Sequence, residues 1–424
     1  MESYDFKEYS GQLDKGSFYH RIYNTPWYHD AIYPRFSGVE FKRRHTLLRQ
    51  AMRQRGFDCL IVPGGQASWS QGGGLTWLTG LVDRRSMAQY AVFPAEGEPL
   101  VVYAMGGAHT ELVRRQVSVS HVLSAIRGRF AETMVEWIKE RGLGKGRIGV
   151  LEVTANPGLE WPPESQMQTL FAGLPEAKIE LVSGLFHQLA YLKSDEEIEA
   201  IARAGALAVE ALERMVEHAG PGISEHKLTA VATRVILAAG GRPDFIRVGA
   251  TPGAAPALTL ANPLPSNREL QAGDMVLLEV SAMLQGVTAQ AGTVICVDQP
   301  DLVVQQFWNE VMLPGFRQLE AHLHPGTNLN EIQHAAAFFR QKGAQSAPLL
   351  LHGLDIEAGT PRVFANDIQA EPFEETLQPG MVVVLRPNPL TADGQWGMCL
   401  SRTYAITGQG CRLLTDYPLE MVYV

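Results

Sequence analysis

The spacing of apolar and polar residues predicts an α/β domain in the first part of the chain. From Ser37 to about residue 190, apolar residues recur at helical spacing in some stretches and in short continuous runs in others. This pattern predicts helices at 40–55 and 131–141 and strands at 58–63, 89–94, 99–103, 147–152 and 179–182. The glycines at 72–74 fit no nucleotide-binding fingerprint, so we interpret them as a flexible turn.

The second part of the chain, from about residue 191, has a different order of elements. Ser194 and Glu197 have the spacing of a capping box, which predicts the start of a helix that runs to about His218. Ser224 is placed to cap the next helix, which ends near Ala239. A second helix pair is predicted at 302–323 and 330–342, and strands are expected between and after the two pairs.

Between the two helix pairs, residues 273–297 predict a buried β-hairpin. Met275–Val280 is an apolar run, a turn is expected around Gln285-Gly286, and Thr293–Val297 is a second run rich in β-branched residues. Glu279 lies inside the first run, where an unpaired carboxylate is costly to bury. It is therefore either a reactive group or the partner of a buried arginine.

Composition excludes several classes of protein. The chain has 424 residues, of which 46% are hydrophobic and 19% charged, enough to bury large cores. Its net charge of −9, without a long basic run, argues against nucleic acid or an anionic membrane as partner. The N-terminal residues contain no apolar core, and the chain has no long apolar stretch, so we expect a soluble, unexported, cytoplasmic protein. The 4 cysteines lack CxxC spacing and are expected to be reduced thiols.

Residues 1–36 differ from the rest in their density of aromatic side chains. The aromatic residues are interleaved with prolines, and they include Tyr19, Tyr23, Trp27, Tyr28 and Tyr33. We expect an extended arm that packs on the protein's own surface or on the partner in a dimer. The alternative is a lid over an active site.

Segments of the second part resemble the signature segments of the pita-bread metallopeptidases, the family of methionine aminopeptidase, aminopeptidase P, prolidase and creatinase. They are GDMVLLEVSAMLQGVTAQAGTV (273–294), HGLDIEAGTPRV (352–363), VVVLRPNP (382–389) and GMCLSRTYAIT (397–407). LTWLTGL (75–81) is similar to the family's N-terminal segment after the first strand. The resemblance implies an α/β N-terminal domain at 37–190 and an α+β pita-bread domain of the catalytic type at 191–424.

The same resemblance implies a dinuclear metal site, yet this chain departs from its ligand set. The family's hairpin aspartates match Glu279 and Gln290, its histidine matches His352, and its last glutamates match Arg386 and Ser401, while a glutamate position falls near Gly359 or Thr360. Hard divalent metals need several anionic oxygen ligands. Arg386 would instead place a fixed positive charge beside the metals. We therefore expect no metal and no other cofactor.

The side chains that remain predict a different kind of site. We expect Glu279 and His352 to be catalytic, and the substrate to be bound by Arg386, Arg402, Gln290, Asn262 and Ser401. Asn262 stands where relatives carry a substrate histidine, and an amide cannot transfer protons near neutral pH. Other roles stay open: Arg386 could simply neutralise Glu279, and Gln290 and Ser401 could only line the pocket. We expect Asp355 and Glu357 to be solvated.

Creatinase and ectoine hydrolase are family members that work without this ligand set, and ectoine hydrolase has a glutamate at the position of Glu279. We therefore predict a metal-independent hydrolase that cleaves a C–N bond in a small carboxylate-bearing molecule, such as an amidine, a guanidino acid or a cyclic amino-acid derivative. Glu279 would act as nucleophile or base, and His352 would move the proton to the leaving nitrogen. Two alternatives stay open: an atypical Xaa-Pro metallopeptidase, and a non-catalytic module that binds a peptide or protein. The resemblance to creatinase and prolidase implies a homodimer.

Overall fold

A computed structural model describes residues 35–64, 73–82, 88–106, 108–152, 161–262, 264–346, 349–354, 359, 361–365 and 374–424. The aromatic arm up to residue 34, together with Gly72, Asp355, Glu357 and Thr360, lies outside these residues. The chain divides into two compact units, 1–189 with 356–358, and 190–355 with 359–424. Each unit is considered by itself.

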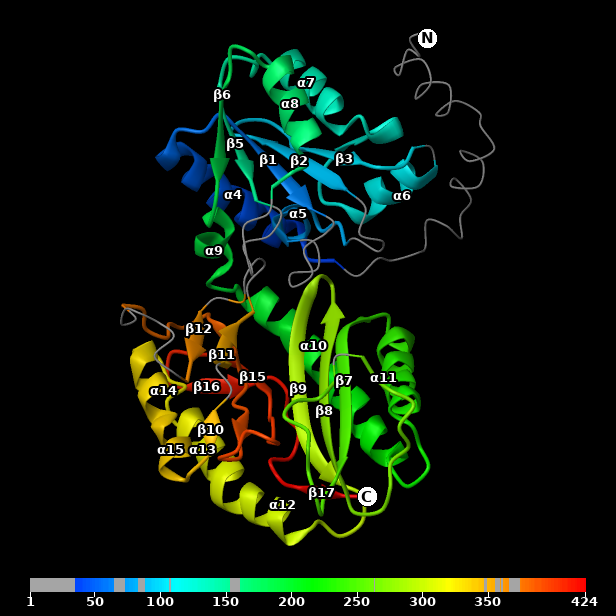
Figure 1. Ribbon diagram of the computed structural model, residues 1–424. Coiled ribbons are helices and arrows are strands. Elements are labelled where there is room, and N and C mark those ends of the chain that lie inside the picture. The colour runs from blue at the N-terminus through cyan, green and yellow to red at the C-terminus, as the bar shows by residue number, and fades with distance from the viewer. Residues whose placement is uncertain are drawn as a thin grey trace. The chain divides into compact units, whose positions relative to one another are not determined.

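The N-terminal unit is an α/β domain, as the sequence predicted (Figure 1). Its six-stranded sheet has the order β4-β3-β2-β1-β5-β6, and β2 runs antiparallel to both of its neighbours. The strands are β1 (Cys59–Gly64), β2 (Gln89–Pro94), β3 (Leu100–Tyr103), β4 (His121–Ser124), β5 (Arg147–Leu151) and β6 (Lys178–Val182). The helices are α4 (Gly38–Arg55), α5 (Gly73–Thr79), α6 (Ala108–Gln116), α7 (Phe130–Glu140), α8 (Glu164–Gly173) and α9 (Leu185–Ala190).

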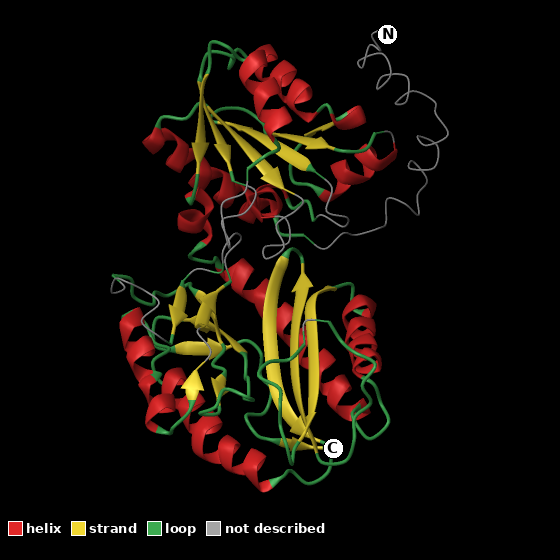
Figure 2. Cartoon of the chain, in the orientation of Figure 1, coloured by secondary structure: helices red, strands yellow, loops and turns green. Residues whose placement is uncertain are grey.

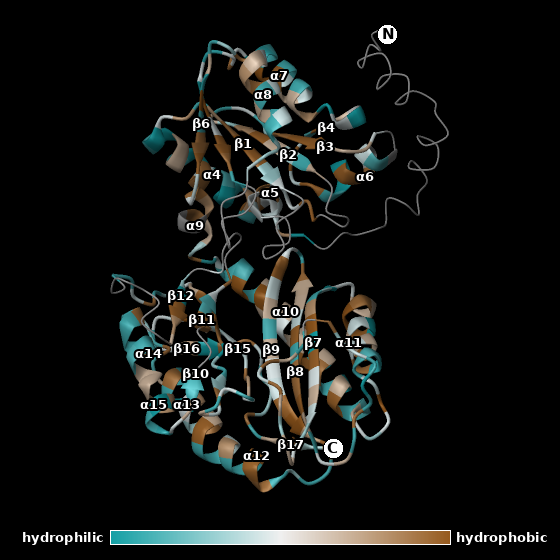
Figure 3. Cartoon of the chain, in the orientation of Figure 1, coloured by the Kyte–Doolittle hydropathy of each residue, from teal (hydrophilic) through white to brown (hydrophobic). Residues whose placement is uncertain are grey.

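The layers of this unit follow from the burial of its strands. β1 and β2 are buried along their whole length, so both faces of the sheet need covering. Figure 1 shows α7 and α8 on one face and α4 and α5 on the other, and Figure 3 shows the strands mostly in the brown of apolar residues. The predicted helices and strands are confirmed, whereas α5, α6, α8, α9 and β4 were not predicted. Gly73 and Gly74 begin α5 and are not a turn.

The C-terminal unit begins with two helices packed on a mixed sheet, in which the final short strand runs parallel to its neighbour and the other pairings are antiparallel (Figure 2). The predicted capping box at Ser194 and Glu197 is present at the start of α10 (Asp195–His218), and Ser224 caps α11 (Glu225–Ala238). The sheet has the order β17-β9-β8-β7 and is formed by β7 (Arg242–Pro252), β8 (Asp274–Leu284), β9 (Val287–Cys296) and β17 (Val422–Tyr423). Gln285 and Gly286 both have positive φ in the two-residue turn between β8 and β9, which fits the twist of a hairpin.

The second half of this unit contains a five-stranded sheet of order β12-β11-β13-β15-β16 and a short pair, β10 and β14. These strands are β10 (Gln345–Ser346), β11 (Leu349–Gly353), β12 (Arg362–Phe364), β13 (Val382–Leu385), β14 (Pro389–Leu390), β15 (Arg402–Ile406) and β16 (Cys411–Leu413). The accompanying helices are α12 (Leu302–Phe307), α13 (Leu313–Glu320), α14 (Leu329–Ala335) and α15 (Ala337–Gln341). The order of elements in this unit is therefore the one predicted for a pita-bread domain: a helix pair, a hairpin, a second helix pair and final strands.

The helix predicted at 302–323 is interrupted. A π-helical turn, η2 (Trp308–Met312), separates α12 from α13. Pro314 lies in the first turn of α13 and has no N–H group to donate to the preceding turn, which accounts for a break at this point. The apolar spacing was correct, but it does not report a local change in helix type.

Two expectations from composition can be compared with the described residues. All four cysteines are free thiols, as predicted. In the part of the chain that is described, none of the helices is both long and apolar enough to cross a membrane.

Candidate functional site

The hairpin β8–β9 has two faces, and Glu279 lies on the one turned away from α10 and α11. Side chains alternate along a strand, so Val276, Leu278 and Val280 pack with the apolar residues of α10 and α11, while Met275 and Leu277 pack with the second half of the unit. Glu279 continues the second row. The hairpin therefore presents this carboxylate to the five-stranded sheet.

Glu279 is 3% exposed, and both of its oxygens are engaged. Arg386, just after β13, donates from Nε to Oε1 at 2.5 Å and from Nη2 to Oε2 at 3.1 Å. Arg247, its cross-strand neighbour on β7, donates from Nη1 to Oε2 at 2.7 Å. Gln290 on β9 donates from Nε2 to Oε1 at 2.5 Å. Two arginines and an amide thus hold one buried carboxylate.

These contacts set the charge of Glu279. Burial by itself would raise the pKa of the carboxyl, but Arg386 and Arg247 outweigh it and lower the pKa to about 2. The neighbouring carboxylate in turn raises the pKa of Arg386, against the effect of burial. At neutral pH all three groups are charged, and the carboxylate is a weak base. The predicted role of Glu279 as nucleophile or base is therefore less favourable than a role in holding the two guanidinium groups in place.

His352 lies on β11, and electrostatics connect it to the same cluster. Its Nδ1 lies 2.9 Å from the carbonyl oxygen of Gly353, which can only accept, so Nδ1 carries the proton and the lone pair is on Nε2. Burial lowers the pKa of His352 to about 4, and the positive charges of Arg386 and Arg362 act in the same direction. The imidazole is therefore neutral at neutral pH and can accept a proton.

Ser401 and Asn262 flank the cluster from two sides. The backbone of Ser401 pairs with Gly292 on β9, directly across from Glu279. In the described part of the chain, the buried hydroxyl of Ser401 has no hydrogen-bond partner. A Cβ on Gly292 would lie 2.6 Å from Ser401 Oγ and 3.5 Å from Glu279 Cγ, so the missing side chain allows this close approach. The backbone of Asn262 pairs with Val248, the residue after Arg247 on β7.

Arg402 was also predicted to bind the substrate, but its side chain contacts residues outside the Glu279 cluster. It follows Ser401, so on the strand it points to the opposite face of the sheet. Its guanidinium donates to the carbonyl oxygen of Tyr417 and lies 3.9 Å from Glu320, which also accepts from the hydroxyl of Tyr404. These contacts account for Arg402 as part of a separate structural cluster.

The residues of the cluster do not fit a dinuclear metal site. The only carboxylate matching a ligand position is Glu279, and it already accepts from two arginines and an amide. Ser401 and Gln290 offer neutral oxygens, and Arg386 places a positive charge where the metals would need anionic ligands. Within the described ranges, no group of three His, Cys, Asp or Glu side chains is arranged to hold a metal ion.

Sequence reasoning missed two members of the cluster. Arg247 lies in a stretch, 244–262, whose conformation the pattern does not reveal, although one charged residue in a β-prone run beside a buried glutamate is a signal that could have identified it. Cys399 is buried near both arginines and Glu279, as their influence on its thiol indicates. Burial raises the pKa of Cys399 to about 12, with Arg386 and Arg247 acting against it, so the thiol is neutral.

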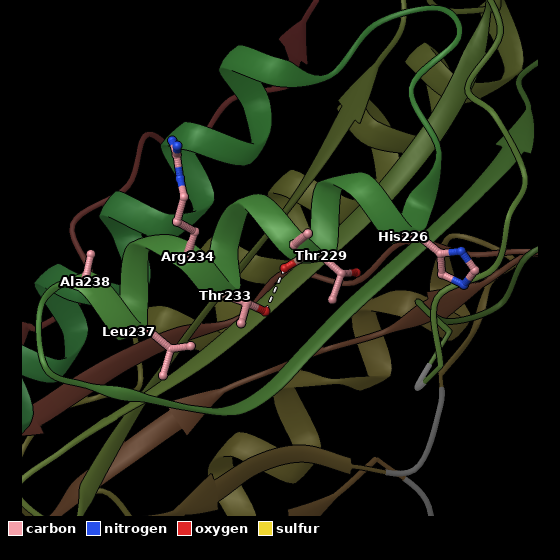
Figure 4. A pocket seen from close by; sticks show the side chains of 7 residues that line it. His226, Thr229, Thr233, Arg234, Leu237 and Ala238 are labelled. Carbon is pink, nitrogen blue, oxygen red and sulfur yellow. Dashed lines mark hydrogen bonds between the residues drawn. The ribbon is translucent and has the colours of Figure 1, made fainter.

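A separate surface pocket lies along α11 and has a volume of about 750 Å³ (Figure 4). It is lined by one face of the helix, from His226 to Ala238, and the hydrogen bond drawn there joins Thr233 to the backbone of Thr229. His226 and Arg234 are its titratable groups. The pocket lacks a carboxylate, so it offers less chemistry than the Glu279 cluster.

Comparison with known proteins gives one family match and several relatives. The model of metallopeptidase family M24 matches residues 199–413. The probable dipeptidase PepE of Mycobacterium tuberculosis is 25% identical over 253 residues, which are 58% of this chain and 64% of that protein. The Xaa-Pro dipeptidase of Pyrococcus horikoshii is 24% identical over 246 residues, 57% of this chain and 67% of that protein. The chain thus aligns with slightly less than two thirds of the mycobacterial relative.

Solved structures show the same fold over most of the chain. The dipeptidase PepE of Mycobacterium ulcerans superposes with a TM-score of 0.70 at 21% identity, covering 92% of this chain and 99% of that one. The X-Pro aminopeptidase of Thermotoga maritima superposes with a TM-score of 0.74 at 16% identity, covering 90% and 99%. At this level of identity, the likeness establishes the fold and no more.

Proposed function

The chain belongs to metallopeptidase family M24, and on that premise we propose that it is a hydrolase that cleaves an amide-type C–N bond in a small molecule. Relatives named as dipeptidases support a peptide bond better than an amidine or guanidino bond. The observation that carries the proposal is a neutral histidine, His352, close enough to Arg386 and Glu279 for their charges to act on it, in a cluster where Glu279 also holds Arg247.

The residues of the cluster are suited to distinct tasks. His352 Nε2 takes a proton from a water molecule as its oxygen attacks the carbonyl carbon, and it returns the proton to the nitrogen as the C–N bond breaks. The products are then a carboxylic acid and an amine, and transfer of the acid's proton to the amine gives a carboxylate and an ammonium ion at neutral pH. Glu279 holds Arg247 and Arg386 in one geometry, so that their remaining donors can orient a substrate near His352.

The test is release of amine from a panel of dipeptides, with and without a proline in second position. The purified chain is compared in three states: as prepared, after EDTA, and after addition of Mn²⁺, Co²⁺ or Zn²⁺. We expect hydrolysis that EDTA does not abolish. Activity found solely with added metal would retain the hydrolase and reject the metal-independent step.

His352→Gln should lower the rate by roughly a hundredfold or more, because it removes the proton carrier. His226→Gln, on the outer face of α11, is the matched control and should leave the rate unchanged. The rate should fall as pH is lowered toward about 4, where His352 becomes protonated. The pH–rate profile should show no decline around pH 6.5, the ordinary pKa of a histidine. Such a decline, or an equal loss in both variants, would contradict the role of His352.

A second candidate function is binding of a peptide or protein without hydrolysis. It is favoured by Glu279, whose two oxygens are both occupied and whose low pKa makes it a poor base. Saturable binding of a dipeptide with no amine release in any of the three states would favour this function over the hydrolase.

A further inference from the structure

We propose that Arg247 and Arg386 form a carboxylate-binding site, so that the natural ligand of the Glu279 cluster is a small molecule with one free carboxylate. This inference deepens the proposed function because it concerns the same cluster. It would also stand if the cluster bound its ligand without cleaving it.

The first argument is the balance of charge. Glu279 is the carboxylate that pairs with the two guanidinium groups, and one carboxylate cannot neutralise both. His352 and Cys399 are neutral at neutral pH, so neither offsets the difference. Counted over the residues that the structure describes, the cluster thus carries one surplus positive charge in a largely buried place, where an unpaired charge is costly. A monoanionic ligand removes that cost.

The second argument is the supply of hydrogen-bond donors. A guanidinium has five N–H groups in a planar fork. Arg386 uses Nε and Nη2 on Glu279, and Arg247 uses Nη1. Within the described residues, Arg386 Nη1 and Arg247 Nε and Nη2 have no acceptor. The side chains are 11% and 21% exposed, so solvent reaches them. The unused donors are therefore open to a ligand.

The third argument is the hydroxyl of Ser401. It is 1% exposed and has no hydrogen-bond partner among the described residues, and such groups are rare in folded proteins unless water or a ligand satisfies them. It lies beside Gly292, directly across the hairpin from Glu279. The hydroxyl is therefore a further donor on the side of the cluster that faces Gly292. An unpaired donor and a surplus charge thus occur at the same place.

Charge also selects the class of anion. A planar carboxylate matches the fork of a guanidinium and carries one negative charge, equal to the surplus. A phosphate dianion would leave the cluster with excess negative charge. The chain's net charge of −9 also disfavours large polyanions.

The experiment measures binding to the full chain with a matched pair of probes, N-acetylglycine and its neutral analogue N-acetylglycinamide, with inorganic phosphate as a third. Arg247→Gln is the test variant, because Arg386 and Gln290 still hold Glu279 after the change. Arg43→Gln is the matched control: it removes the more exposed of the two arginines that hold another buried glutamate, Glu40. Thermal unfolding confirms that both variants fold, and Arg247→Lys serves if Arg247→Gln does not.

We expect N-acetylglycine to bind the wild-type chain at least roughly tenfold more tightly than the amide, with an affinity that decreases as salt is added. Arg247→Gln should lose about tenfold or more of that affinity, whereas Arg43→Gln should retain it. Equal binding of acid and amide, unchanged binding in Arg247→Gln, tighter binding of phosphate, or no binding of the acid at millimolar concentration would each overturn the proposal. Carboxylate binding without hydrolysis would overturn the proposed function and leave this inference standing. Hydrolysis of dipeptides and of their C-terminal amides at equal rates would support the proposed function and overturn this inference.

Discussion

Two buried glutamates in this chain are each held by a pair of arginines, Glu40 in the N-terminal unit and Glu279 in the C-terminal unit. Both are 3% exposed. Around Glu40 the arginines are Arg43 and Arg44, three and four residues along the same helix, α4. Around Glu279 they come from β7 and from the segment after β13, so the second cluster exists only after the unit has folded.

The two clusters also differ in the contacts that their arginines make beyond the glutamate. Arg44 donates to the carbonyl oxygen of Trp77 and packs 4.1 Å from the ring centroid of Phe36, and Arg43 is one-third exposed. The surplus positive charge of the Glu40 cluster is therefore stabilised by a backbone carbonyl, by aromatic rings and by water. Arg247 stacks 4.2 Å from the Phe245 ring but keeps donors without an acceptor in the described chain. A structural pair uses its donors internally, whereas a ligand site leaves some for the ligand.

The largest expected effect is that of Glu279→Gln. The change leaves two largely buried guanidinium groups without a counter-charge, so the free energy of unfolding should fall by about 3–5 kcal/mol. Urea denaturation of the variant beside the wild type measures it. A loss below about 1 kcal/mol would mean that water already neutralises this cluster, which would remove its difference from Glu40.

Acid should weaken the Glu279 cluster next. The folded-state pKa of Glu279 is lowered from 4.5 to about 2, so its stabilisation is fully present above pH 4.5 and is lost as pH falls toward 2. The contribution is on the order of 3 kcal/mol. Unfolding of the wild type measured from pH 6 to pH 3 should show the decline, and Glu279→Gln should lack that component. The same decline in both proteins would assign it to other carboxylates.

Glu40→Gln should cost less, about 1–2 kcal/mol of unfolding free energy, because Arg43 reaches water and Arg44 keeps Trp77 and Phe36. Binding of N-acetylglycine should not change, since this cluster has no role in the site. Thermal melts with and without the probe test both statements. A loss as large as that of Glu279→Gln would show that the two clusters have the same energetics.

The smallest effect on stability is expected for Arg247→Gln and Arg43→Gln, each below about 1 kcal/mol, since the remaining arginine still pairs with the glutamate. Chemical denaturation of the two variants compares them directly. The loss should be the smaller for Arg247→Gln, because this change also removes the surplus charge. A loss of about 3 kcal/mol or more, as for a broken buried ion pair, would show that Arg247 mainly stabilises the fold.

Much of the fold was predictable because periodic patterns report local backbone geometry. The capping box at Ser194 and Glu197, the turn at Gln285 and Gly286, and the strands β1, β2 and β5 lie where the sequence placed them. Some errors fall where a pattern is short or interrupted, as in the four-residue β4 and at the π-helical turn before Pro314. The helices α6 and α8, of 9 and 10 residues, were missed as well. The sequence left two roles open for Glu279, reaction or pairing with a buried arginine. The geometry favours pairing, since Arg386 and Arg247 both donate to its carboxylate.

The sequence by itself determined that a carboxylate lies in an apolar strand, and that the family's ligand positions are occupied by Gln290, Arg386 and Ser401. These are properties of single positions and of near neighbours. Only the tertiary structure decided that Arg386, 107 residues from Glu279, and Arg247, 32 residues from it, close on the same carboxylate while Arg402 does not. The physical reason is that strand periodicity sets the face on which a side chain lies, whereas the packing of one sheet against another sets which distant side chain meets it.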